Sequence, residues 1–108
     1  MNRIRLPTTR KGVTHKVRVG ACSMYLTANT KDGAIMEVFG KADEGHQAEI
    51  DGLCILASLA LQHGCPAATI ARHLRHRRYP PHGIAGQPCS LSDALGMVLD
   101  GTIKGEAV

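Results

Sequence analysis

The sequence predicts an α+β fold, with a three-stranded antiparallel meander followed by two or three helices that pack on one face of the sheet. Two observations lead to this prediction. Apolar and polar residues alternate through the first part of the chain, whereas apolar residues recur at three- and four-residue spacing from residue 47 onward. The length of 108 residues suits one domain with one modest core.

Three strands are expected before any helix. Alternation in residues 14–19 and 23–28 predicts two strands that are joined at Gly20. The Asp-Gly pair at 32–33 is typical of a hairpin turn, so residues 34–40 are expected to form the third strand.

The segments outside these elements set the limits of the domain. Residues 1–13 are rich in Arg, Lys, Thr and Pro and are expected to form an extended N-terminal arm. The single domain is expected to span residues 14–101. Residues 102–108 lack periodicity and are expected to form a flexible tail.

Residues 47–63 predict the longest helix, and Gly64 ends it. One face carries apolar residues at helical spacing: Ile50, Leu53, Cys54, Ala57, Ala60 and Leu61. Ile55, Leu56 and Leu59 lie off this face, and one small sheet covers only one side of a helix. We therefore expect this second face to contact another subunit and the protein to be a homo-oligomer.

Two shorter helices are predicted after the long one. Pro66 suits the first turn of a helix that runs to about Arg75, because a first-turn residue needs no partner for its N–H. Ser90 followed by Asp93 resembles a capping box and predicts a third helix, which Gly101 ends.

Charge and hydropathy limit the partners. The net charge of +4 and the pI near 9.1 suggest an acidic partner. The excess of positive charge is small and concentrated, which favours a discrete pocket over long nucleic acid. The longest apolar stretch, residues 53–61, is too short to span a bilayer, and the N-terminus has no secretory pattern. We expect a cytoplasmic protein that contacts no membrane.

The chain has four single cysteines: Cys22, Cys54, Cys65 and Cys89. No two of them have the close spacing of a redox or metal motif, so we expect reduced, buried cysteines that act as small hydrophobes. The alternative is a zinc site built from dispersed cysteines with His73 and His76, although zinc ligands usually come in closely spaced pairs. We expect no metal and no cofactor.

The most informative part of the chain is the basic segment, residues 72–83. It holds four arginines, three histidines and Tyr79, one of only three aromatic residues. Guanidinium groups match phosphate oxygens and a tyrosine ring can stack on a base, so the segment is typical of phosphate and nucleobase recognition. One alternative is a solvated basic helix end. Another is that Tyr79 anchors the Pro-rich loop to the core.

A weaker phosphate site is indicated between the third strand and the long helix. Residues 41–47 place Gly45 and free backbone amides at a helix N-terminus beside Lys41. Asp43 and Glu44 oppose an anion, so an ordinary strand-to-helix connection is the alternative.

The six histidines do not complete a catalytic site. No carboxylate pair, no nucleophile beside a base and no second pair of metal ligands accompanies them in the sequence pattern. We therefore expect these histidines to bind anions, cap a helix end or face solvent, and we expect no enzyme activity.

Several short stretches occur in a specific order: Arg5-Leu6-Pro7, Thr14-His15-Lys16, Glu37-Val38-Phe39, Ser58 to Gln62 with Gly64 and Pro66, and then His76, Arg78, Tyr79, Pro81 and Gly83. Through these stretches and their order, the chain resembles the TSCPD family over nearly its whole length. The family occurs as a C-terminal region of adenosylcobalamin-dependent ribonucleotide reductases and as small standalone proteins. In the motif that names the family, residues 89–95 keep the Ser, Asp and Ala but replace the Thr, Cys and Pro.

The resemblance implies an accessory fold, because the chain is too short for the catalytic barrel of a reductase. Small standalone relatives look like phage products. By a looser analogy, some phage proteins of this size and layout are oligomeric sponges that sequester cyclic ADP-ribose-like or cyclic oligonucleotide immune signals. We therefore predict a non-enzymatic nucleotide-binding protein, located in the host cytoplasm if it is phage-encoded.

The predicted nucleotide pocket combines polar residues from several regions: Arg75, His76, Arg77, Arg78, Tyr79, Lys41, Gln47, Gln87 and Asp93. The alternative function is an accessory or regulatory module of adenosylcobalamin-dependent ribonucleotide reductase that acts by protein contacts. A third hypothesis is a sequence-neutral nucleic-acid binder, whose affinity for long polymers would depend steeply on salt.

Overall fold

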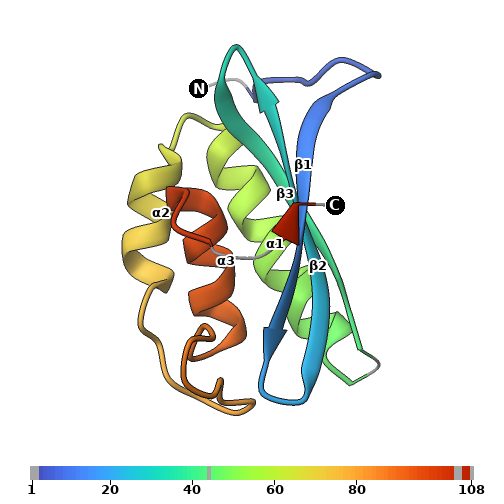
Figure 1. Cartoon of the computed structure of the whole chain (residues 1–108). Coiled ribbons are helices and arrows are strands. Elements are labelled where there is room, and N and C mark those ends of the chain that lie inside the picture. Colours follow the sequence, from blue (N-terminus) through green and yellow to red (C-terminus); the bar gives the residue numbers. More distant parts are fainter. Residues whose placement is uncertain (1–2, 44, 104–105, 108) are drawn as a thin grey trace.

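The computed structural model describes residues 3–43, 45–103 and 106–107. The elements in chain order are β1 (Lys11–Val19), β2 (Cys22–Lys31), β3 (Ala34–Ala42), α1 (Gln47–Gln62), α2 (Ala67–Leu74), α3 (Leu91–Asp100) and β4 (Glu106–Ala107). The strands pair antiparallel in one sheet of order β3-β2-β1-β4, and the helices lie on one face of it (Figure 1). The α+β prediction is therefore confirmed.

The meander follows the alternation in the sequence. Met24 and Leu26 of β2 are buried under the helices, whereas Tyr25 between them is exposed on the outer face of the sheet. Asp32 and Gly33 have φ angles of 54° and 82°. A tight hairpin turn requires such positive values, which Asp and Gly tolerate best.

The first strand is longer than predicted. β1 begins at Lys11, because its ladder with β2 continues to the pair of Lys11 and Thr30. The extended arm is therefore shorter than residues 1–13. Its described part lies beside α1, where the Ile4 N–H donates to the Gln62 carbonyl oxygen at 2.6 Å.

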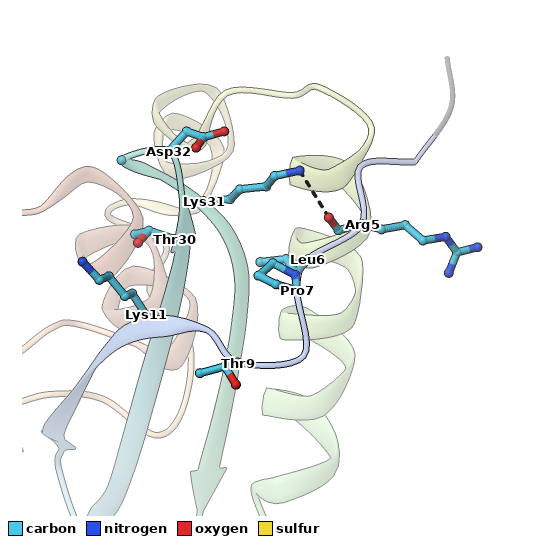
Figure 2. A pocket seen from close by; sticks show the side chains of 9 residues that line it. Arg5, Leu6, Pro7, Thr9, Lys11, Thr30, Lys31 and Asp32 are labelled. Carbon is cyan, nitrogen blue, oxygen red and sulfur yellow. Dashed lines mark hydrogen bonds between the residues drawn. The ribbon is translucent and has the colours of Figure 1, made fainter.

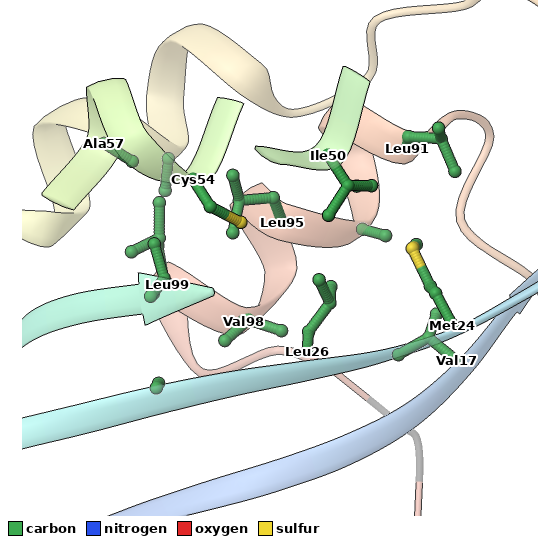
Figure 3. Packing of buried hydrophobic residues seen from close by; sticks show 14 of the residues in the cluster. Val17, Met24, Leu26, Ile50, Cys54, Ala57, Leu91, Leu95, Val98 and Leu99 are labelled. Atoms are coloured by element: carbon green, nitrogen blue, oxygen red, sulfur yellow. The ribbon is translucent and has the colours of Figure 1, made fainter. Parts of the chain in front are cut away.

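The core lies between the sheet and the inner sides of α1 and α3 (Figure 3). Its largest fully buried apolar side chains are Met24, Leu26, Ile50, Leu61, Leu91 and Leu95. Each such side chain contributes about 1.5–3 kcal/mol by leaving water. The predicted inner face of α1 is found, although Leu53 and Ala60 at its margin are only half-buried.

α1 also closes the outer edge of β3. The Ser58 hydroxyl accepts from the Val38 N–H and donates to the Val38 carbonyl oxygen, both at 2.9 Å. The side chains of Gln47 and Gln62 bond the backbone of the same strand at 2.7 and 3.1 Å. Because an open strand edge invites pairing with other strands, these three side chains protect β3.

The helix ends match the sequence in most details. Gly64 takes a φ of 98° just beyond α1, and Gly101 takes 79° just beyond α3, as glycines at these positions usually do. The Ser90 hydroxyl accepts from the Asp93 N–H at 3.1 Å. Pro66 differs from the prediction, because it precedes α2 as its N-cap instead of lying in the first turn.

The C-terminal segment also differs from the prediction. β4 pairs with His15 and Lys16 of β1, so residues 106–107, within the expected flexible tail over residues 102–108, form a short strand of the sheet. This pairing joins positions far apart in the chain, and a local pattern cannot reveal it. Residues 104, 105 and 108, on which the same prediction falls, lie outside the described residues.

Candidate functional site

The basic segment begins in the last turn of α2 and continues into the loop that leads to α3 (Figure 1). α2 ends at Leu74, and Arg75 has extended backbone angles. His76 has a positive φ of 65°, and its N–H bonds a carboxylate of α3. The loop is therefore attached to α3 from its start.

Asp93 of α3 holds both ends of this loop. It is 5% exposed, and its carboxylate accepts from the N–H of His76 at 2.8 Å and of Cys89 at 3.0 Å. The Arg75 Nε donates to it at 3.0 Å. Burial acts to raise the pKa of Asp93, but these donors outweigh it and keep the pKa below its usual value. The carboxylate thus bonds the loop and not the Ser90 N–H that a capping box would use.

Arg75 is an internal residue of the loop. Besides Asp93, its guanidinium donates to the Asp100 carboxylate at 2.7 Å and to the Thr102 hydroxyl at 3.0 Å. The bond to Asp100, followed by that to Asp93, raises the pKa of Arg75. Sequence reasoning placed Arg75 and Asp93 in a ligand pocket, whereas the structure pairs them with each other. Asp100 was missed, although an acid at the negative end of a helix indicates a cationic partner.

Tyr79 contacts the N-terminal turn of α3. Its hydroxyl lies 2.5 Å from the Ser92 hydroxyl and accepts from the Ser92 N–H at 3.0 Å. Burial raises the pKa of this half-buried tyrosine. These contacts support the interpretation of Tyr79 as a loop anchor.

Gln87 holds the far side of the same loop. Its Oε1 accepts from the Gly20 N–H at 2.8 Å, in the turn between β1 and β2, and from the Ile84 N–H at 3.1 Å. This predicted ligand residue therefore attaches the loop to the sheet.

Lys41 and Gln47 line a different hollow. It has a volume of about 460 Å³, lies on the outer face of the sheet and includes Tyr25 and Phe39. Gln47 also bonds the β3 backbone through both ends of its amide. The structure thus places these two residues with exposed aromatic rings and not with the basic segment.

The outward side of the basic segment is cationic. Arg72, Arg77 and Arg78 are exposed, as are His73 and His76. The Arg77 Nε donates to the His73 carbonyl oxygen at 3.0 Å. Asp93 and Tyr79 fix the loop behind Arg77 and Arg78, and exposed guanidinium groups can pair with an anionic group.

The connection before α1 stays a prediction as a phosphate cradle. The Asp43 carboxylate accepts from the Ser23 N–H at 2.8 Å, so this acid has an internal role. The His46 side chain makes no capping bond at the start of α1. Glu44 lies outside the described residues.

A further hollow of about 660 Å³ separates the N-terminal arm from the hairpin of β2 and β3 (Figure 2). Arg5, Lys11 and Lys31 line it together with Asp32. The Lys31 ammonium donates to the Arg5 carbonyl oxygen at 3.4 Å and bridges the opening. Sequence reasoning gave this hollow no role, because its walls come together only in the folded chain.

Within residues 3–43, 45–103 and 106–107, no three His, Cys, Asp or Glu side chains gather as metal ligands would. No helix there has the length and hydropathy to cross a bilayer.

The four cysteines are all free thiols. Cys22 and Cys54 are buried, as predicted, but Cys65 and Cys89 are only half-buried, so the prediction is wrong for these two. Both of them lie in connections beside helix ends, where the chain does not cover them fully. Burial, with a smaller effect of Asp51, raises the pKa of Cys54 to about 12, so this thiol stays protonated near neutral pH.

Sequence comparisons add a family to this geometry. Residues 2–102 match the model of the TSCPD domain. A vitamin B12-dependent ribonucleotide reductase from Streptantibioticus cattleyicolor is 33% identical over 90 residues, which are 80% of this chain and 15% of that protein. The enzyme of the same description from Streptomyces coelicolor is 33% identical over 90 residues, with 80% and 9% covered. That from Agrobacterium fabrum is 30% identical over 100 residues, with 89% and 8% covered. No solved structure matches the chain.

Proposed function

Because this chain belongs to the TSCPD domain family, we propose that it is a non-catalytic module that works with a vitamin B12-dependent ribonucleotide reductase through protein contacts. One observation carries this proposal. The match covers 80–89% of this chain but only 8–15% of the three reductases. The chain therefore corresponds to one small folded unit of much longer enzymes, and the large remainder of those enzymes has no counterpart in it.

The exposed cations of the basic segment support a protein contact. Arg72 is exposed in the last turn of α2, and Arg77 and Arg78 are exposed in the loop that Asp93 and Tyr79 hold in place. Arginines are common in protein interfaces, because a guanidinium pairs well with carboxylates. We propose that this surface contacts an acidic patch on the reductase.

The test uses the Streptomyces coelicolor reductase, a 33% identical relative, with its matched 90-residue segment removed. The full chain is added to the shortened enzyme. Calorimetry measures binding, and a separate assay measures deoxyribonucleotide formation. We expect binding to the shortened enzyme and weaker binding to the intact enzyme, whose own segment competes. The double variant Arg77→Glu, Arg78→Glu should bind at least about tenfold more weakly.

The matched control for charge reversal is Lys11→Glu, because Lys11 is an exposed cation outside the basic segment. This control should bind like the unmutated chain. Failure of the chain to bind either form of the reductase would overturn the proposal.

Nucleotide binding by the same surface is the second candidate. It is supported by the number of exposed guanidinium groups around Arg78, which match phosphate oxygens as well as carboxylates. Arg78→Ala and Tyr79→Ala should each weaken nucleotide binding by about 1–3 kcal/mol if both contact the ligand. Calorimetry with cyclic ADP-ribose and cyclic dinucleotides, without reductase present, tests this candidate separately. Unchanged affinity in folded variants contradicts it.

A further inference from the structure

One side of α1 faces away from both the sheet and the other helices. We define the α1 outer face by its residues, which recur at three- and four-residue spacing: Ala48, Gly52, Ile55, Leu56 and Leu59. Ile55, Leu56 and Leu59 are 58%, 69% and 38% exposed. Large apolar side chains that adjoin on a surface usually mark an interface.

The fold itself does not need this face. The core side of α1 is complete with Ile50, Cys54 and Leu61, which are buried. The flank of α1 that meets β3 is occupied by Ser58 and Gln62, which bond the strand. The outer face is therefore a third side, with no partner in the described part of the chain.

Gly52 is the second sign that another molecule lies on this face. A glycine inside a helix costs about 1 kcal/mol relative to alanine. In the described structure, no atom of another element lies within 4 Å of the place where its Cβ would be. The folded chain thus gains nothing from a glycine here, whereas a neighbouring molecule could approach the helix closely at this point.

The sizes of the side chains indicate what this molecule is. The half of the α1 outer face near the helix N-terminus is small, with Ala48 and Gly52, and the half near the C-terminus is large, with Leu56 and Leu59. A copy of the same helix running in the opposite direction places its large half on the small half of the first. A parallel copy would place the two large halves against each other and the two small halves against each other.

The charges at the two ends agree with the same arrangement. Asp51 flanks the small half, while Arg3 bonds Gln62 at 2.5 Å beside the large half. Arg3 and Asp51 line one groove of about 280 Å³ that also contains Ile55 and Phe39. An antiparallel copy brings Arg3 of each chain toward Asp51 of the other, whereas a parallel copy would bring like charges together.

From these observations we propose that the α1 outer face binds a second copy of this chain, with the two α1 helices antiparallel about a two-fold axis between Gly52 and Leu56. Each chain then uses the same surface patch, as two-fold dimers do. This inference goes beyond the proposed function and does not depend on it, because the basic segment and the α1 outer face are different surfaces.

The experiment measures the mass of the full chain by sedimentation equilibrium from about 1 to 100 µM, the range of ordinary dimers. A dimer is expected. Gly52→Leu and Leu56→Glu should each raise the dimer dissociation constant at least about tenfold. Ala68→Leu is the matched control for Gly52→Leu, because Ala68 is an exposed small residue on α2. Its dimer should be unchanged.

A charge swap tests the orientation. Arg3→Glu and Asp51→Arg should each weaken the dimer, and the double variant should recover most of the loss if the helices are antiparallel. Gly52→Leu adds bulk into open space, so it should fold even if Leu56→Glu does not.

Three results would overturn the proposal. One is a monomer at 100 µM, and another is a dimer that none of the α1 variants weakens. The third is a chain that is monomeric alone but whose Gly52→Leu variant loses binding to the reductase. That result would assign the α1 outer face to the enzyme instead of a second copy.

Discussion

The basic segment is rich in charged residues, whereas the α1 outer face is apolar. Each of the two regions has a side chain in a position that is unusual for its type. In the basic segment, Arg75 turns inward to Asp93 and Asp100. On the α1 outer face, Leu56 is 69% exposed. A charged group can lie inside when its donors find partners, and an apolar group can lie outside when another surface covers it.

Residue type alone therefore does not tell which side chains are available to a ligand. Arg75 and Arg78 lie three positions apart in one segment, yet the first pairs with two carboxylates of its own chain and the second is exposed. The positive surface is therefore smaller than the count of arginines suggests. Substitutions at the inward residues of the basic segment should reduce stability more than substitutions at its outward ones.

The largest effect is expected for Asp93→Ala. This change leaves Arg75 and the N–H groups of His76 and Cys89 without their shared acceptor, so the free energy of unfolding should fall by about 3 kcal/mol. Chemical unfolding followed by circular dichroism measures it. Asp32→Asn is the control, because Asp32 is exposed and Asn also tolerates its positive φ. A loss below about 1 kcal/mol would show that Asp93 does not hold the loop.

A smaller effect is expected for Arg75→Ala. The variant loses bonds to the buried Asp93 and to Asp100, whose side chain is 24% exposed. Because the Arg75 side chain is itself 22% exposed, a loss of about 2 kcal/mol is expected. Arg78→Ala is the matched control from the same segment and should change stability by less than about 0.5 kcal/mol. Equal losses in the two variants would remove the distinction between inward and outward arginines.

Tyr79→Phe tests the anchor with a change of one hydroxyl group. The bonds to Ser92 are lost, so a loss of about 1 kcal/mol is expected. Thermal unfolding measures it, and Ser92→Ala should show a similar loss. If the two hydroxyls act on each other, the double variant should lose less than the sum of the single losses.

Lowering the pH is expected to have the smallest effect on stability as long as the pH stays near neutral. The pKa values of Asp93 and Asp100 are lowered in the folded chain, because their hydrogen bonds to loop donors and to Arg75 outweigh burial. The unfolded chain therefore takes up protons first as the pH falls, and stability falls with it. Little change is expected from pH 7 to 5, followed by a growing loss below about pH 4, where unfolded carboxyl groups gain protons. Asp93→Asn should make this loss smaller, and an equal loss in the variant would contradict the assignment.

The local features of the fold could be predicted from the sequence. The meander, the turn at Asp32 and Gly33, the cap at Ser90 and the helix end at Gly101 all depend on residues within a few positions of each other. Alternation and helical spacing likewise report which way neighbouring residues face. These short-range preferences act in the chain before it folds, so the sequence alone determined them.

Packing of the folded chain determines which polar side chains find partners inside the protein. Asp93 bonds residues 17 and 18 positions away, and β4 joins a strand edge more than 80 positions earlier. Such partners meet only after the helices pack, and the chain offers several acids and bases that could pair otherwise. The family, the order of elements and the apolar faces of α1 can therefore be read from the sequence, whereas packing is needed to turn Arg75 inward and leave Arg78 outward. Hydrogen bonds and ion pairs act over a few ångströms, and only the folded chain sets those distances.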